Sequence, residues 1–244
     1  MSGDKDEKRE IINALFDNDT KQIKPEIIDK YIDLFEGENK INEKTVETVF
    51  RQFPDNSDLY QVLAKVIVLN NRYSAGLTDW SPSKTNVDVL DMAKHIVQIN
   101  ANNHAIDECF DKDKAVETIG KVSRIDAVYN AKHDGGNAID PILRQYNVLS
   151  FASKYCIWTW MVKDTISMPI LDSYVAGMLY FINKTKPFTE SFGQEKIKKD
   201  YGVFYKVYTD FVDNCMPDIQ LNNKQIDEFL WQCAKSNKNS GLRI

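Results

Sequence analysis

Hydrophobic side chains recur along most of this chain at the spacing of an amphipathic helix. The segment 27–35 shows the pattern clearly, with hydrophobic residues at Ile27, Ile28, Tyr31, Ile32, Leu34 and Phe35. A spacing of three or four residues places side chains on one face of a helix, whereas the two-residue alternation of a half-buried strand is rare in this chain. We therefore predict an all-α fold.

Residues that start or stop helices set the expected boundaries. A strongly hydrophobic helix is expected over 58–69 and should end at Asn70 and Asn71, because asparagine favours helix ends and turns. Asn86 or Asp88 can cap the helix that follows. Further helices are expected at about 112–129, 151–163, 173–182, 200–214 and 223–236, the last opened by Asn222 or Asn223.

The domain organisation is expected to be simple. The first ten residues are a run of charges, which we interpret as a flexible tail. The segment His133-Asp134-Gly135-Gly136-Asn137 is the strongest helix breaker, and Asp140 with Pro141 is typical of a new helix start. The predicted layout is a tail, 1–10, and a single helical domain, 11–244, with approximate lobes 11–136 and 137–244 and a cleft between them.

Composition and charge narrow the function classes. The 244 residues are 43% hydrophobic and 27% charged, with a net charge of -5, which is the balance of a soluble globular protein. Because nucleic acid held by bulk charge requires a basic surface, any DNA contact must come from a local patch. The densest basic stretch holds Lys184, Lys186, Lys196, Lys198 and Lys199, and its ordinary interpretation is a solvated surface.

Neither a metal nor a membrane is indicated by the sequence. The cysteines, Cys109, Cys156, Cys215 and Cys233, have no CxxC spacing, and the three histidines do not cluster with them, so a structural zinc and a disulfide framework are not expected. No hydrophobic signal segment follows the charged start, and no run of about 18 hydrophobic residues occurs. We expect an intracellular, cytoplasmic monomer that needs no metal or cofactor and contacts no membrane.

One lysine has unusual neighbours. On a helix that begins near Phe151, Lys154 lies in a stripe with Tyr155, Trp158, Met161 and Val162. The ordinary interpretation is a lysine whose stem packs on hydrophobic surface while its ammonium group reaches water. The alternative is a buried amine, because hydrophobic surroundings lower the pKa of an amine and make it a nucleophile near neutral pH.

An aspartate in the following segment can reach this lysine. Pro169 halts any helix, and Asp172 stands at the N-cap position of the next hydrophobic helix. Residues 154–163 rise about 15 Å along a helix, and the segment 164–171 spans up to about 27 Å when extended. We therefore expect Asp172 beside Lys154, where a carboxylate can accept a proton or stabilise a cationic sugar. A plain helix cap is the alternative role.

Together these residues resemble the helix-hairpin-helix DNA glycosylase superfamily, and most closely its 8-oxoguanine glycosylase-like branch. In that superfamily a hairpin of the form L-P-G-V-G-x-K delivers a lysine at a helix start, and a P-V-D segment further along delivers an aspartate. Here Leu149-Ser150-Phe151-Ala152-Ser153-Lys154 is similar to the hairpin, and Pro169-Ile170-Leu171-Asp172 to the aspartate segment. The resemblance covers roughly residues 58–236.

The resemblance implies a helix-hairpin-helix glycosylase-like fold and a base-excision enzyme of DNA repair. Its substrate would be double-stranded DNA with a modified or damaged base, which is flipped out of the duplex before its sugar is attacked. Lys154 would attack C1′ and form a Schiff base, which gives DNA glycosylase activity with AP-lyase activity. Asp172 would stabilise the oxocarbenium-like state.

Two further stretches are similar to parts of these enzymes. Leu69–Tyr73 resembles the asparagine-rich turn that fills the space left by the flipped base, with Asn70 or Asn71 acting beside Arg72 and Tyr73. The segment 226–235 resembles the closing helix, whose aromatic or glutamine side chains can face the base. The expected pocket walls are Trp158, Phe229, Trp231 or Gln232, for which burial in the core is the ordinary alternative.

The hairpin departs from the family pattern because it lacks both glycines, which let backbone N–H groups approach a DNA phosphate closely. Ser150 and Ser153, on either side of Phe151, would offer hydroxyl donors instead. Three functions therefore stay open. They are a DNA glycosylase of repair or of defence against hypermodified viral DNA, an inactive glycosylase-like module that binds DNA or protein, and a helical interaction protein without a nucleic-acid role.

Overall fold

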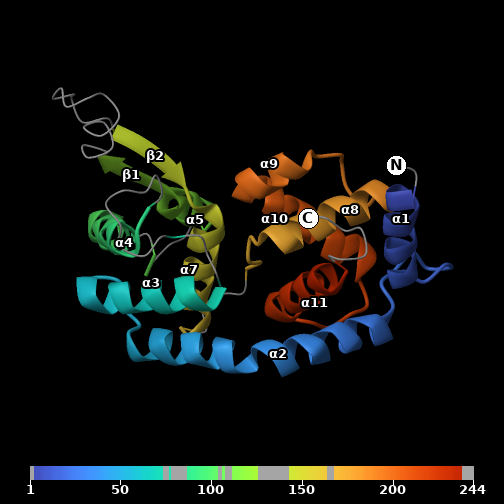
Figure 1. Cartoon of the computed structure of the whole chain (residues 1–244), viewed down its shortest axis with the longest axis horizontal. Coiled ribbons are helices and arrows are strands. Elements are labelled where there is room, and N and C mark those ends of the chain that lie inside the picture. The colour runs from blue at the N-terminus through green and yellow to red at the C-terminus, as the bar shows by residue number, and fades with distance from the viewer. Residues whose placement is uncertain are drawn as a thin grey trace. The chain divides into compact units, whose positions relative to one another are not determined.

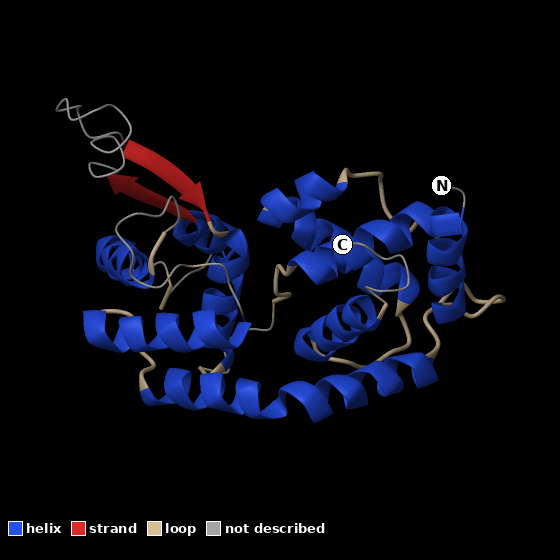
Figure 2. Ribbon diagram, viewed as in Figure 1, coloured by secondary structure: helices blue, strands red, loops and turns tan. Residues whose placement is uncertain are grey.

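The protein is mostly helical, as predicted. The computed structural model describes residues 3–73, 77, 87–103, 106–107, 112–125, 143–163 and 168–237. Figure 2 shows helices throughout this part of the chain, with one two-stranded sheet as the exception. None of the described helices is long and hydrophobic enough to cross a membrane.

The helices differ widely in length, from the short α9 to the long α2 (Figure 1). Their bounds are α1 Gly3–Leu15, α2 Pro25–Gln52, α3 Leu59–Tyr73, α4 Val89–Asn103, α5 Lys112–Gly120, α7 Leu149–Met161, α8 Ser173–Thr185, α9 Gln194–Lys199, α10 Tyr201–Cys215 and α11 Asn223–Ser236. The expected helices over 173–182, 200–214 and 223–236 agree with α8, α10 and α11 to within a few residues.

The chain forms two compact units, each described here by itself. Unit 1 contains Met1–Ile41 and Ser167–Ile244, and unit 2 contains Asn42–Ile166. The expected lobe boundary at residues 136 and 137 falls inside unit 2. The division differs because α8 packs against α1, from the opposite end of the chain, and such a non-local contact leaves no mark in local sequence.

Most of the segment 1–10, predicted as a flexible tail, belongs to α1, which begins at Gly3. Glutamate, lysine and arginine all have high helix propensity, so a run of mixed charges can continue a helix. The helix is anchored at its other end, where Ile12, Leu15 and Phe16 are buried.

Three predicted helix caps are confirmed. Asp88 Oδ1 accepts a hydrogen bond from Asp91 N at 2.8 Å, and Asp172 Oδ1 accepts one from Tyr174 N at 2.8 Å. Asn222 forms a capping box with Gln225 at the start of α11. Each cap satisfies an N–H group that has no partner within its own helix.

The predicted helix over 112–129 is wrong at residues 121–125, which form a strand. Asp140 and Pro141, the predicted start of a new helix, lie outside the described residues. Strand β1, Lys121–Ile125, pairs antiparallel with β2, Leu143–Asn147. Glycine is a poor helix residue, and Val122 and Ile125 are β-branched, so the local preference changes at the end of α5. The breaker over 133–137 lies outside the described residues.

Helix α7 forms the core of unit 2. Every residue from Phe151 to Trp160 is buried, so the stripe expected on one face is in fact a helix buried on all sides. Helices α3 and α5 pack against it. In unit 1, α8 has the corresponding central position, with α1, α9, α10 and α11 packed against it.

Candidate functional site

Lys154 lies in the second turn of α7 and is almost completely buried, with 3% of its surface exposed. Its Nζ donates a hydrogen bond to Ser150 Oγ at 2.9 Å and lies 5.9 Å from the centroid of the Tyr73 ring. An ammonium group over an aromatic face is attracted by the ring quadrupole. The ammonium group therefore does not reach out into water, as the ordinary interpretation of a surface lysine expects.

Tyr73 and Trp158 flank this lysine. Trp158 lies one helical turn after Lys154 and is 2% exposed, and its Nε1 donates to Tyr73 Oη at 3.1 Å. The tyrosine hydroxyl in turn donates to Glu43 Oε1 at 3.3 Å. The structure thus brings together two residues that the sequence assigned to different roles, Tyr73 to the filling turn and Trp158 to the pocket.

The rest of the expected filling turn is not a turn. Asn70, Asn71, Arg72 and Tyr73 all belong to α3. Asn70 is buried and exchanges hydrogen bonds with the backbone of Leu77, from Leu77 N to Oδ1 at 3.0 Å and from Nδ2 to Leu77 O at 3.1 Å. Asn70 thus fastens the chain that follows α3. The helix continues past the two asparagines because packing of the hydrophobic helix outweighs their weak preference for a turn.

The expected hairpin before Lys154 is helical. Helix α7 begins at Leu149, and Ala152 N donates to Val148 O at 2.9 Å. Ser153 is buried and its Oγ donates to Ser150 O at 3.1 Å. Its hydroxyl proton is therefore engaged inside the helix, whereas we expected it to be offered to a phosphate. Phe151 is buried as well and stacks on Tyr155, with ring centroids 6.0 Å apart. Without glycines these residues have no preference for a hairpin and extend the helix.

Helix α7 is connected to α5 through a two-stranded sheet, in place of the hairpin that the family resemblance implies before Lys154. The two helices pack together, and the strands β1 and β2 join them, closed at the base by a hydrogen bond of 2.8 Å from Val148 N to Gly120 O. A Cβ atom on Gly120 would lie only 2.8 Å from Leu149 Cδ2. Glycine is therefore needed here for a close approach of the two helix ends rather than for a DNA phosphate.

Asp172 caps α8 and belongs to unit 1, whereas Lys154 belongs to unit 2. Its extended backbone, with φ -117° and ψ 148°, is typical of an N-cap residue. The expected contact between Asp172 and Lys154 stays a prediction.

The three pocket residues expected on α11 have different surroundings. Phe229 is fully buried against the Tyr31 ring, so it is a core residue and not a pocket wall. Trp231 is half-buried, and Lys235 Nζ lies 4.7 Å from its ring centroid. Gln232 is 2% exposed, and its Oε1 accepts no hydrogen bond from the described residues. A buried amide oxygen of this kind is an acceptor that a ligand can use.

A second buried lysine escaped the sequence reasoning. Lys65 of α3 has no exposed surface, and its Nζ donates to Asp55 O at 2.8 Å and to Asn56 Oδ1 at 2.7 Å. The Tyr155 hydroxyl donates to the same Asn56 oxygen at 2.6 Å. Burial lowers the pKa of Lys65 to about 7, although Asp107 opposes that shift. Lys65 lies in the hydrophobic run 58–69, the same kind of signal that singled out Lys154.

Asp107 extends the network around Lys65. It accepts hydrogen bonds from Asn56 Nδ2 and Asn100 Nδ2, each at 2.8 Å, and pairs with Lys163 Nζ at 2.7 Å. Burial by itself would raise the pKa of Asp107, but the hydrogen bonds from Lys163 and Asn56 hold that pKa below its usual value. The Lys65 amine is enclosed and its acceptors belong to this network, which indicates a structural role, although Asn100 Oδ1 accepts no hydrogen bond from the described residues.

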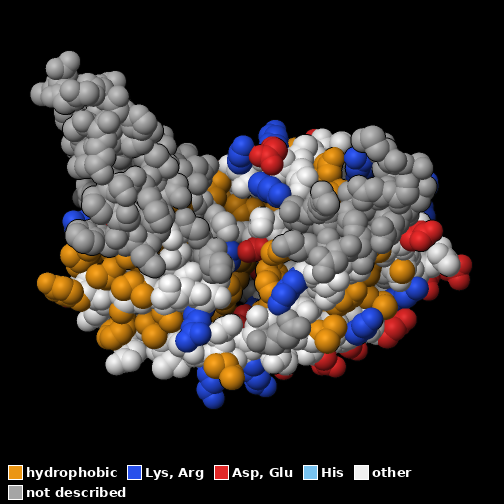
Figure 3. All heavy atoms as spheres, viewed as in Figure 1, with side chains coloured by type: hydrophobic (Ala, Val, Ile, Leu, Met, Phe, Trp, Pro, Cys, Tyr) orange, Lys and Arg blue, Asp and Glu red, His pale blue; other side chains and the backbone are white. Residues whose placement is uncertain are grey.

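The described residues provide little basic surface and no metal cluster. Among them no group of three or more His, Cys, Asp or Glu residues is placed to hold a metal ion. On the face drawn in Figure 3, lysine and arginine side chains are scattered among acidic ones. In the basic stretch of α9, Lys199 pairs with Glu195 at 2.9 Å, as expected for a solvated surface.

Fold and site together define a mostly helical protein in which one central helix carries a buried lysine. The chain belongs to the HI_0787 N-terminal domain family, whose model matches residues 27–163, more than half of the chain. An uncharacterized protein of Haemophilus influenzae is 35% identical over 86 residues, which are 35% of this chain and 36% of that relative. The match thus spans about a third of the relative's length. No solved structure matches the chain.

The family match divides the candidate residues. Lys154, Tyr73 and Trp158 lie within the matched residues 27–163, and so does the Lys65 cluster. Asp172 and Gln232 lie outside them. The buried lysine of α7 is therefore part of the family domain.

Proposed function

We propose that this protein is a DNA glycosylase with AP-lyase activity, in which Lys154 is the nucleophile and Asp172 assists. The observation that carries the proposal is the burial of Lys154, at 3% exposure, on a helix buried on all sides. Lysine is seldom fully buried in a protein, so this position is a candidate for a functional amine. An amine held away from water is the group that Schiff-base chemistry requires.

The surroundings of Lys154 suit an attacking amine. Ser150 Oγ and the Tyr73 ring hold the Nζ atom in a defined position, which reduces the entropy lost when it meets a substrate carbon. Tyr73 is itself fixed by the hydrogen bond from Trp158. Tyr73, which is half-buried, offers surface on which an extruded base can stack.

The proposed reaction proceeds in two steps. Lys154 Nζ, deprotonated, forms a bond to C1′ as the C1′–N bond to the base breaks, and the base leaves with the bonding electron pair and takes up a proton. One of the two amine protons is then lost, and the C1′–O4′ bond breaks as O4′ takes up a proton, which opens the sugar ring and gives a protonated Schiff base. Loss of a proton from C2′ then breaks the C3′–O bond and releases the 3′ phosphate, which nicks the strand. The Asp172 carboxylate stabilises the positive charge that develops on the sugar.

Base recognition is proposed for α11. Gln232 Oε1 is buried and accepts no hydrogen bond from the described residues, so an N–H group of a flipped base would satisfy it. Trp231 is half-buried beside it along the helix and offers a stacking face. The excised base would be a modified or damaged one in double-stranded DNA, in repair or in defence against modified viral DNA.

Borohydride trapping tests the proposal. Hydride reduces a Schiff base to a stable amine, so an active protein becomes cross-linked to DNA. The duplexes would carry an abasic site, 8-oxoguanine or modified cytosines, and the proteins would be the wild type and Lys154→Ala. We expect a cross-linked band with the wild type that is absent with Lys154→Ala, and the reactive duplex identifies the substrate class.

Lys94→Ala is the matched control, because Lys94 is an exposed lysine of α4 in the same unit. It should cross-link like the wild type. Circular dichroism of Lys154→Ala must show a native melting transition. A wild-type protein that cross-links to none of the duplexes, the abasic one included, would contradict the lyase mechanism.

A second candidate is a binding module without catalysis. The helical start of α7 favours it, because the glycine hairpin that grips a phosphate is replaced by helix. In a gel-shift titration, such a module would bind the modified duplexes, and its Lys154→Ala variant would bind them with the same affinity as the wild type. Affinity without any trapping would favour this function over the enzyme.

A further inference from the structure

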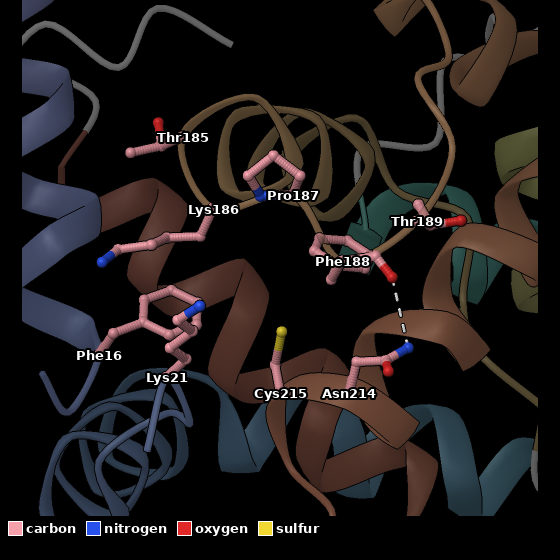
Figure 4. A pocket seen from close by; sticks show the side chains of 9 residues that line it. All are labelled: Phe16, Lys21, Thr185, Lys186, Pro187, Phe188, Thr189, Asn214 and Cys215. Atoms are coloured by element: carbon pink, nitrogen blue, oxygen red, sulfur yellow. Dashed lines mark hydrogen bonds between the residues drawn. The ribbon is translucent and has the colours of Figure 1, made fainter. Parts of the chain in front are cut away.

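A cavity in unit 1 is lined by none of the residues expected from the sequence. Its volume is about 460 Å³, within the range of small-molecule sites. It lies between the loop after α1, the segment after α8 and the end of α10 (Figure 4).

One part of the cavity wall is hydrophobic. Phe16 and Phe188 lie on either side of the Cys215 thiol, with Pro187 above them in Figure 4. Burial raises the pKa of Cys215 to about 12, so the thiol is protonated and uncharged at neutral pH. The floor of the cavity therefore repels neither a hydrophobic group nor an anion.

Two lysines from separate segments line the same cavity. Lys21 comes from the loop after α1, and Lys186 is the C-cap residue of α8. Within the described part of the chain neither ammonium group has an ion-pair partner. Two cations without counter-charges beside a hydrophobic cavity favour an anionic occupant.

The backbone of Lys21 is strained, with φ at 58°. This left-handed region favours glycine and asparagine, and a lysine there is uncommon. Strained residues of this kind cluster at ligand sites, where the surrounding structure holds them in place. Here Asp17 holds the loop, because its Oδ1 accepts hydrogen bonds from Asp19 N and Thr20 N, each at 2.9 Å.

The other side of the cavity is held just as firmly. Asn183 Oδ1 accepts hydrogen bonds from Phe188 N at 2.9 Å and Thr189 N at 3.1 Å. Asn214 Nδ2 donates to Phe188 O at 3.3 Å, the dashed line in Figure 4. A cavity whose walls are fixed before binding loses little conformational entropy when a ligand enters.

The acidic side chains near the cavity are already engaged. Hydrogen bonds from the backbone of Thr20 and Asp19 lower the pKa of Asp17. Asp210 accepts from Lys206 and Thr189, and Asp218 accepts from Gln22. These carboxylates do not pair with Lys21 or Lys186.

We propose that this cavity binds a small aromatic anion. The aromatic ring lies against Phe16 and Phe188, and the phosphate or carboxylate group meets the ammonium groups of Lys21 and Lys186. Either a nucleoside monophosphate or an aromatic carboxylate provides this chemistry. The site is independent of the glycosylase reaction, because it contains neither Lys154 nor Asp172.

Isothermal titration calorimetry with phenyl phosphate tests the proposal on the full chain. We expect dissociation constants in the millimolar range or tighter, and roughly tenfold weaker binding in Lys21→Asn and in Lys186→Ala. Asparagine tolerates the left-handed backbone, so Lys21→Asn removes the charge without strain. Lys184→Ala is the matched control, because Lys184 is an exposed lysine two residues from Lys186 that does not line the cavity.

Titrations with four further ligands complete the experiment. Inorganic phosphate and benzyl alcohol should each bind more weakly than phenyl phosphate, because each lacks one half of the recognised group. Comparing the affinities for deoxycytidine monophosphate and phenylacetate shows whether the site prefers a nucleoside monophosphate or an aromatic carboxylate. The proposal is overturned if phenyl phosphate does not bind, if inorganic phosphate binds equally well, or if Lys184→Ala weakens binding as much as Lys21→Asn.

Discussion

Unit 2 buries two lysines in different surroundings, one on α3 and one on α7. Lys65 meets a backbone carbonyl and an amide oxygen, which fix the segment before α3 to the helix. Lys154 meets a serine hydroxyl one turn earlier on its own helix and the face of Tyr73. Lys65 thus connects segments of the fold, whereas Ser150 and Tyr73 orient the Lys154 amine.

Burial is therefore common to Lys65 and to Lys154, the proposed nucleophile, and the two lysines differ in their contacts. Lys65 is the more deeply buried of the two, yet its acceptors belong to a network that holds Tyr155 and Asp107 together. The Lys65 ammonium group meets carbonyl and amide oxygens, whereas a serine hydroxyl and an aromatic face meet the Lys154 Nζ atom.

The largest expected effect on stability comes from replacing Lys65, the lysine with the structural role. Lys65→Ala leaves a cavity and an Asp55 carbonyl without its donor, so we expect a loss of about 3 kcal/mol in the free energy of unfolding. Lys154→Ala should cost clearly less. Urea denaturation of both variants measures the difference, and equal losses would contradict the assignment of separate roles.

The pH dependence of stability also depends on Lys65. Its pKa is about 7 in the folded protein against 10.5 ordinarily, so between these values the unfolded chain binds more protons. The free energy of unfolding therefore rises with pH in this window. From pH 7 to about pH 8.5 we expect a rise of about 1–2 kcal/mol that is absent in Lys65→Met.

The rise in stability with pH has an upper limit, which the buried cysteines set. Burial raises the pKa of Cys215 and Cys233 to about 12, while thiols in the unfolded chain ionise near their ordinary pKa of 9.0. Stability therefore falls again as the pH passes that value. Lys94→Met, which removes an exposed lysine, should keep the wild-type slope below it. A Lys65→Met slope equal to wild type would mean that Lys65 keeps an ordinary pKa.

A smaller effect on stability is expected from replacing Gly120, which lies against the start of α7. In Gly120→Ala the new Cβ would lie 2.8 Å from Leu149 Cδ2 and 3.3 Å from Leu149 Cα, so the Leu149 side chain must move and its backbone must shift slightly. We expect a loss of about 1 kcal/mol in urea denaturation. The same change should lower the yield of trapping by Lys154 and leave the pH dependence from Lys65 unchanged. Gly37→Ala is the control, because no atom lies within 4 Å of its added Cβ.

The smallest effect on stability separates the two roles of Asp172. Asp172→Ala removes a helix cap and should cost about 1 kcal/mol, whereas Asp172→Asn keeps the cap. Trapping by Lys154 should be weakened in both, because both remove the carboxylate charge. Asp200→Ala is the matched control, since Asp200 caps α10 through Val203 N at 3.0 Å. Full trapping with Asp172→Asn would limit Asp172 to its role as a cap.

The sequence by itself was sufficient for the helical class and for the caps at Asp88, Asp172 and Asn222. These features depend on residues within one or two helical turns, so their physics is local. It was also sufficient to single out Lys154, because a lysine within an uninterrupted hydrophobic run is visible in the sequence. The same rule would have found Lys65 had it been applied to the run 58–69.

Only the tertiary structure decided which of these side chains meet. The antiparallel pairing of β1 with β2, the packing of α8 against α1, and the contact of Lys154 with Tyr73 all join segments that are distant in the chain. Local preference carries no information about such contacts. The asparagines of α3 and the serines of α7 favour turns locally, but the burial of hydrophobic surface around these helices is worth more free energy than that preference and keeps both segments helical.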